Sequence, residues 1–65
     1  MIKFPNVTVE LVGSDGNAFA IIGKVTNALR KSGVSKEEIT NYRNEAMSGD
    51  YDNLLAVTMS TINVE

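Results

Sequence analysis

The sequence GSDGN at residues 13–17 separates two apolar segments that have different periods. Residues 7–12, which precede it, alternate between faces as in a half-buried strand. Residues 18–25, which follow it, are the most apolar part of the chain and begin a helical pattern. The two glycines suit a turn that needs positive φ, and Asn17 is a preferred N-cap, with Asp15 as the competing choice. This stretch therefore predicts a strand, a tight turn and a buried helix.

The strand alternation assigns each residue to a face. Pro5 cannot donate to a sheet ladder, so it is expected just before the strand or at its start. One face carries Val7, Val9 and Leu11, and the other carries Thr8, Glu10 and Val12.

The first helix has a broad apolar face and a clear end signal. Gly33 is expected to end it in the left-handed conformation, with Arg30 and Lys31 in the last turn. The expected apolar face consists of Ala18, Ile21, Ile22, Val25, Ala28 and Leu29.

The start of the second helix is marked by a capping box and a hydrophobic staple. Ser35 and Glu38 have the spacing of the box, and Val34 and Ile39 have that of the staple. The helix is expected to run to about Met47. Its inward stripe is predicted to be Ile39, Tyr42 and Ala46.

A third helix is expected after Gly49, with Asp50 or Asp52 as its N-cap. Residues 61–65 alternate and could form a short strand, so the pattern leaves open whether helix or strand takes Thr61 and Ile62. The residues at helical spacing are Tyr51, Leu54, Leu55, Thr58, Met59 and Ile62. The predicted fold is a single α+β domain over residues 1–65, ordered β-α-α-α, with the short C-terminal strand, if formed, pairing with the first.

Composition narrows the range of functions. The 65 residues contain no cysteine and no histidine, which removes disulfides, thiolate chemistry, Cys/His zinc sites and histidine-based catalysis. The oxygen-bearing side chains near Asp50 lack the later ligands of a calcium loop and are expected to cap helices. No nucleophile has an activating base beside it. We therefore expect a non-enzymatic protein without metal or cofactor.

Charge argues against nucleic acid as the main partner. The net charge is −2, and the third helix carries no cation and opens with aspartates. The first 34 residues carry four cationic side chains against two acidic ones, and the rest carry two against six. Lys24, Arg30 and Lys31 in the first helix leave a weaker alternative, a nucleic-acid or phosphate ligand. In that alternative the ligand would also meet the turn residues Gly13, Ser14, Gly16 and Asn17.

Three motifs resemble a group of short proteins encoded in bacteriophage and prophage genomes. They are G-x-D-G-N-A-F at residues 13–19, A-L-R-x-x-G-V-S-K-E-E-I at 28–39 and S-G-D-Y-D-x-L-L at 48–55. The resemblance covers most of the chain and implies a phage or prophage setting. Because the group has no assigned activity, it implies no site residues.

A chain of this size without disulfides or metal ligands is expected to gain stability by association. Two short strands would leave exposed sheet edges that a second copy could pair with. We therefore expect a homodimer or a different protein partner. The expected contact residues are Val7, Val9, Val12, Ile62 and Val64. No signal peptide or membrane span is evident, which favours the cytoplasm of a bacterial host cell.

Overall fold

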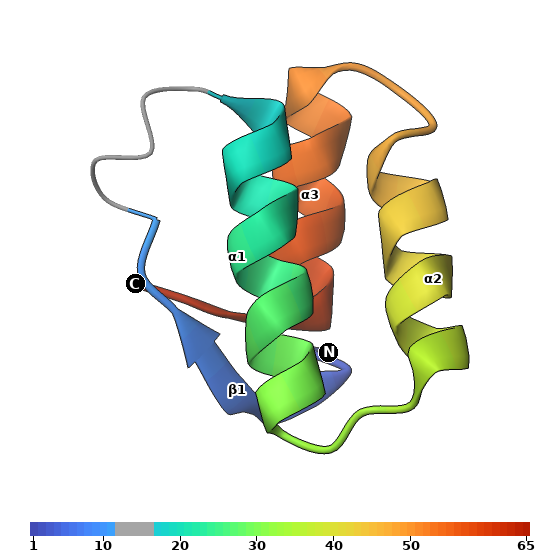
Figure 1. Cartoon of the computed structure of the whole chain (residues 1–65). Coiled ribbons are helices and arrows are strands. Elements are labelled where there is room, and N and C mark those ends of the chain that lie inside the picture. Colours follow the sequence, from blue (N-terminus) through green and yellow to red (C-terminus); the bar gives the residue numbers. More distant parts are fainter. Residues whose placement is uncertain (12–16) are drawn as a thin grey trace.

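The computed structural model describes residues 1–11 and 17–65 and shows three helices and a two-stranded sheet (Figure 1). The order is β1, α1, α2, α3 and β2, which confirms the predicted β-α-α-α arrangement and the C-terminal strand. The elements span Phe4–Val9 (β1), Ala18–Lys31 (α1), Lys36–Ala46 (α2), Tyr51–Thr61 (α3) and Ile62–Val64 (β2).

The two strands pair in parallel, with Thr8 opposite Asn63 and Val9 opposite Val64. The three helices run alternately down, up and down in Figure 1, so the chain enters β2 in the direction in which it left β1. Beyond the ladder, Glu65 N donates to Val9 O at 3.0 Å. The first and last strands are therefore joined by main-chain hydrogen bonds.

The bounds of the first strand differ from the prediction. We expected residues 7–12, and the structure has Phe4–Val9. The strand includes Pro5, and the register is irregular between Phe4 and Thr8, which accommodates a residue without an N–H. The facing was predicted correctly, because Val7 and Val9 are buried and Thr8 is exposed. Pairing with β2, rather than local pattern, decides where the strand begins.

The core lies between α1, the sheet and the other two helices. α2 packs against both α1 and α3, and β1 packs against α1. The predicted inward residues of α1 and α2 are confirmed as buried or partly buried. The residues least exposed to solvent are Ile21, Val25, Leu29, Leu54, Thr58 and Ile62.

The residues that share helical spacing on α3 do not all face the core. Leu54 and Thr58 are buried, but Tyr51 is 38% exposed and Met59 60% exposed, while Thr61 is buried. The face that meets α2 is centred on Leu54, Thr58 and Thr61, which places Met59 about 100° away from Thr58 around the helix. Thr61 is the last residue of α3 and Ile62 begins β2, which settles the open boundary.

The joints follow the predicted capping signals in most respects. Gly33 has φ +84°, and Val34 N donates to Leu29 O at 3.0 Å, so α1 ends in a Schellman motif. Ser35 Oγ accepts from Glu38 N at 3.2 Å, as the capping box predicts. The Glu38 carboxylate lies 2.8 Å from Lys3 Nζ, so this ion pair takes the place of the second hydrogen bond of the box.

One polar contact lies inside the core. The Tyr42 hydroxyl and Thr58 Oγ1 are 2.8 Å apart, and both residues are buried where α2 meets α3. Burial raises the pKa of the Tyr42 phenol above its ordinary value, and the hydrogen bond with Thr58 offsets part of that rise. This contact joins the two helices at one buried point, because each hydroxyl is the hydrogen-bond partner of the other.

Candidate functional site

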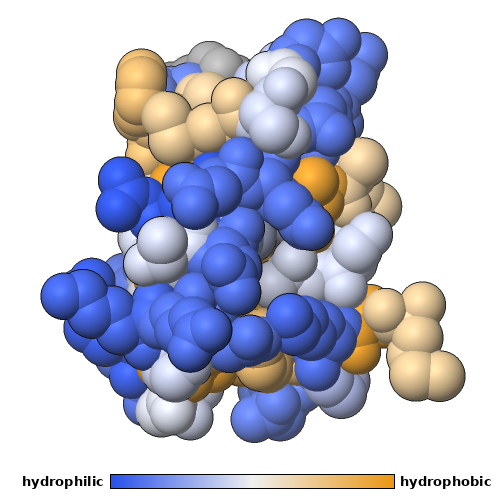
Figure 2. All heavy atoms as spheres, turned by 90° about the vertical axis from the view of Figure 1, so that its right-hand side faces the viewer, coloured by the Kyte–Doolittle hydropathy of each residue, from blue (hydrophilic) through white to orange (hydrophobic). Residues whose placement is uncertain are grey.

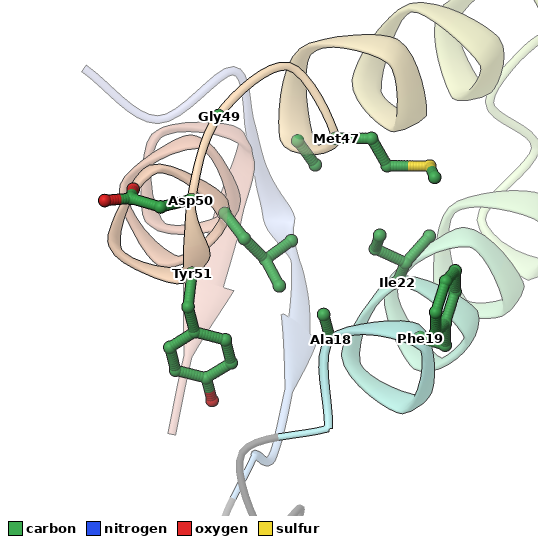
Figure 3. Close-up of a pocket in the computed structure, with 9 residues that line it drawn as sticks. Ala18, Phe19, Ile22, Met47, Gly49, Asp50 and Tyr51 are labelled. Carbon is green, nitrogen blue, oxygen red and sulfur yellow. The ribbon is translucent and has the colours of Figure 1, made fainter.

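A shallow depression of about 220 Å³ lies where the start of α1 meets the α2–α3 joint (Figure 3). Its walls are mostly apolar. The lining residues are Ala18, Phe19, Ile22, Ala46, Met47, Gly49, Asp50, Tyr51 and Leu54.

The first wall is set by the N-cap of α1. Asn17 Oδ1 accepts from Phe19 N at 3.0 Å and from Ala20 N at 3.2 Å, which fixes the first turn. In that turn Ala18 and Ile22 face inward, whereas Phe19 lies one residue off the apolar stripe and is 74% exposed. The helix therefore holds a large aromatic ring in solvent on a defined backbone.

The second wall is the α2–α3 joint, whose path is fixed by several hydrogen bonds. Asp50 Oδ1 accepts from Asn53 N at 2.9 Å, and Asn53 Nδ2 donates to Glu45 O at 3.0 Å. A Cβ on Gly49 would lie 2.9 Å from Asn53 Cβ, so the turn needs a glycine here. The joint is therefore well defined and places Met47 and Tyr51 at the rim.

Three large apolar side chains surround the depression, and we call Phe19, Met47 and Tyr51 the helix-end patch. Met47 is 53% exposed and Tyr51 38%. In Figure 3, Met47 and Phe19 lie on the same side as Ile22, and Tyr51 lies on the other side, so the opening is between them. Figure 2 shows a group of apolar atoms at the upper left of a face that is mostly hydrophilic, and a second apolar group at its lower right.

The chemistry of the depression is that of a binding surface. Its volume is below the range of about 300–1,000 Å³ that is usual for small-molecule sites. Asp50 is the single ionisable acid in its lining, and it caps α3. The depression has the size and polarity to take one apolar side chain of a partner.

A second depression continues from the first along the groove between α1 and α2. It measures about 270 Å³ and shares Phe19 and Ile22 with the first. Arg30, Lys36 and Arg43 line it, and no acidic side chain is among its described lining residues. This groove is therefore basic, although the chain as a whole is acidic.

A third depression, of about 320 Å³, surrounds the ion pair of Lys3 and Glu38. The hydrogen bond and charge of Glu38 raise the pKa of Lys3. Both side chains are substantially exposed, and exposed ion pairs contribute little to stability. We assign no function to this pair beyond joining the N-terminal segment to α2.

The predicted turn residues are only partly within the described chain. Gly13, Ser14 and Gly16 lie outside the described residues, as does Val12. Asn17 caps α1, and its side-chain oxygen accepts from the amides that an anion would need.

The predicted contact residues lie mainly in the interior. Val7, Val9 and Ile62 are buried within the single chain, and Val64 is half-buried. Their side chains therefore offer little surface to a second copy, and pairing through the sheet would use the strand edges instead. Self-association stays a prediction.

Sequence reasoning missed the helix-end patch, although a signal was present. Phe19 directly follows Ala18, at a position that the stripe of Ile21, Ile22 and Val25 does not include. A large aromatic residue outside the apolar stripe of a helix is not needed for packing the core, so it indicates a candidate contact surface. Met47 carries a weaker signal, since it directly follows the buried Ala46.

No protein-family model, curated protein or solved structure matches the chain. Within residues 1–11 and 17–65, no group of three or more acidic side chains is placed to hold a metal ion. Among the same residues, no helix has the length and apolar character needed to cross a bilayer.

Proposed function

We propose that the protein is a non-enzymatic interaction module that binds another protein through the helix-end patch. The observation that carries the proposal is the exposure of Phe19, Met47 and Tyr51 around one apolar depression. Exposed apolar clusters of this kind mark binding surfaces, and aromatic residues and methionine are enriched in them. The capped helix ends hold the patch in place, so little ordering is needed when a partner binds.

The resemblance to phage and prophage proteins directs the search for the partner to the cytoplasm of a bacterial host. The alternative, a phosphate ligand at the glycine turn, has weaker support because the Asn17 oxygen already accepts from the first amides of α1.

The test is site-specific photo-crosslinking in cells that carry the gene. Phe19 is replaced by p-benzoylphenylalanine, which keeps an aromatic ring at the patch. The matched control carries the same group at Asn27, an exposed position of the same helix that does not line the depression. We expect a discrete crosslinked protein from position 19 that is absent from position 27 and is lost when Met47 is changed to Ser. The same products from both positions, or none from position 19, would contradict the proposal.

A further inference from the structure

The apolar depression and the basic groove adjoin each other, because Phe19 and Ile22 line both. α1 and α2 are antiparallel, so the order along the surface follows from the sequence. Met47 and Phe19 lie at one end, Arg43 comes about one turn further along, and Arg30 and Lys36 lie at the other end. An apolar end is therefore followed by three cations.

The three cations are available to a partner. The carboxylates of the described residues form one ion pair, with Lys3, and none lies within 4 Å of Arg30, Lys36 or Arg43. Arginine and lysine in a groove without acids favour carboxylates or phosphates as ligands. The groove is therefore complementary in charge to an acidic ligand.

The floor of the groove contains a glycine that the free chain does not need. Gly23 lies in the middle of α1, where glycine lowers helix stability relative to alanine. A Cβ built on it would meet nothing within 4 Å. The missing side chain thus relieves no contact in this structure, and its effect is to let a ligand approach the helix backbone closely.

We propose that the groove binds an acidic peptide segment of a partner protein, with one bulky apolar residue seated at the helix-end patch. This inference rests on the proposed function and specifies the chemistry of the partner. A peptide is favoured over nucleic acid because the net charge of the chain is −2 and α3, whose first turn forms one wall of the apolar depression, carries no cation. Thr40 also lines the groove and can bond to the main chain of an extended segment, and Thr26 Oγ1, which donates to Gly23 O at 3.1 Å, can accept from it.

The spacing of the groove predicts the spacing of the ligand. From Met47 to Arg43 is one turn, about 6 Å, and from Met47 to Lys36 is about 16 Å at the rise of an α-helix. An extended peptide advances about 3.3 Å per residue. Side chains on one face of an extended segment recur at even spacings, so acidic residues are expected two positions and four or six positions from the apolar anchor.

The test is selection of a randomised twelve-residue peptide library on the immobilised full chain, followed by fluorescence anisotropy with the enriched peptides. We expect enrichment of an apolar anchor with acidic residues at the predicted spacing. Arg30→Gln should weaken binding about tenfold by removing a charge-assisted contact. Lys31→Gln is the matched control, because it removes the same charge from the same last turn outside the groove. The affinity of Lys31→Gln for the peptides should equal that of the unmodified chain.

Gly23→Gln tests whether peptide binding is lost because the groove is blocked or because the fold is lost. Glutamine is a better helix former than glycine, so the melting temperature should not fall while peptide binding is lost. The inference would be overturned if the enriched peptides lack acidic residues and bind Arg30→Gln as well as the unmodified chain. If the binding of these peptides still depends on Phe19, the proposed function stands. If no peptide is enriched, or if binding is indifferent to Phe19→Ser, both are wrong.

Two further results would assign the groove to another occupant and overturn the inference. One is binding of a twelve-nucleotide oligo-dT that competes with the peptides and falls steeply between about 50 and 200 mM salt, which would indicate nucleic acid. The other is dimerisation of the chain that Arg30→Gln abolishes and Lys31→Gln does not, which would identify a second copy as the occupant.

Discussion

Replacing Thr58 by Val is expected to be more damaging than its small size suggests. The substitution keeps the shape of the side chain but removes the hydrogen-bond partner of the Tyr42 hydroxyl, which lies 2.8 Å away inside the core. A buried hydroxyl without a partner costs about 1–3 kcal/mol of folding free energy. Because Tyr42 lies at the edge of the depression around Lys3, where water can approach, we expect about 1–2 kcal/mol.

Tyr42→Phe, which removes the other hydroxyl of the pair, should cost less folding free energy. It leaves the Thr58 hydroxyl buried, but a threonine in a helix can bond to the carbonyl four residues earlier. Thr61 and Ser60 of the same helix already do so, to Val57 O and Ala56 O. The double variant removes both hydroxyls, so its loss should be smaller than the sum of the single losses by about 1 kcal/mol.

Urea denaturation measures these differences directly. A small domain that unfolds in two states has a slope of about 1 kcal/mol per molar urea, so Thr58→Val should lower the midpoint by about 1–2 M. Thr40→Val is the surface control, since Thr40 is exposed on α2, and it should shift stability by less than about 0.5 kcal/mol. If Thr58→Val and Thr40→Val have the same midpoint and the double-mutant cycle shows no coupling, the hydrogen bond does not form in solution.

Four further predictions follow from other parts of the structure. Ser35→Ala should destabilise the fold by about 1 kcal/mol through loss of the N-cap of α2, and a urea midpoint equal to that of the unmodified chain would contradict this. Gly33→Ala should lower the melting temperature, because φ +84° costs a residue with a Cβ about 1 kcal/mol. Gly23→Ala should raise the melting temperature, because alanine stabilises the middle of a helix by a similar free energy. Shifts of the same sign would refute the argument. Because the pKa of Tyr42 is raised, the folded chain holds the phenol proton more tightly than the unfolded chain does. The contribution of the protonated Tyr42 to stability is therefore complete below pH 10.0 and is lost at higher pH. Tyr42→Phe should make this alkaline loss of stability smaller in urea titrations at several pH values. Self-association should appear in sedimentation equilibrium at tens of micromolar, and a single species of 7.0 kDa at all concentrations would rule it out.

Most of the fold could be predicted from local signals. Asn17, Ser35 and Gly33 each occupy the cap position that the sequence indicated, because capping depends on the residue and its immediate neighbours. The period-two pattern gave the correct facing of Val7 and Val9 for the same reason.

The errors arose where distant partners decide the outcome. β1 begins at Phe4 because β2 pairs there, and nothing in residues 1–12 carries that information. Met59 is exposed because α3 presents the Leu54–Thr58–Thr61 face to the bundle, and the apolar side chains of α3 are compatible with more than one face. The same limit applies to the helix-end patch, because Phe19 and Met47 are far apart in the sequence and meet only when α1 and α2 are antiparallel.

The parallel pairing of the first and last strands determines how the domain responds to mechanical tension. A force that pulls the N-terminal side of β1 away from the C-terminal side of β2 acts along both strands in opposite directions (Figure 1). The hydrogen bonds of the ladder, together with those from Glu65 N to Val9 O and from Leu11 N to Glu65 O, are then loaded together in shear. In a hairpin pulled at its open end they would break one after another. The short sheet thus acts as a mechanical clamp, and the three helices carry no load until it yields.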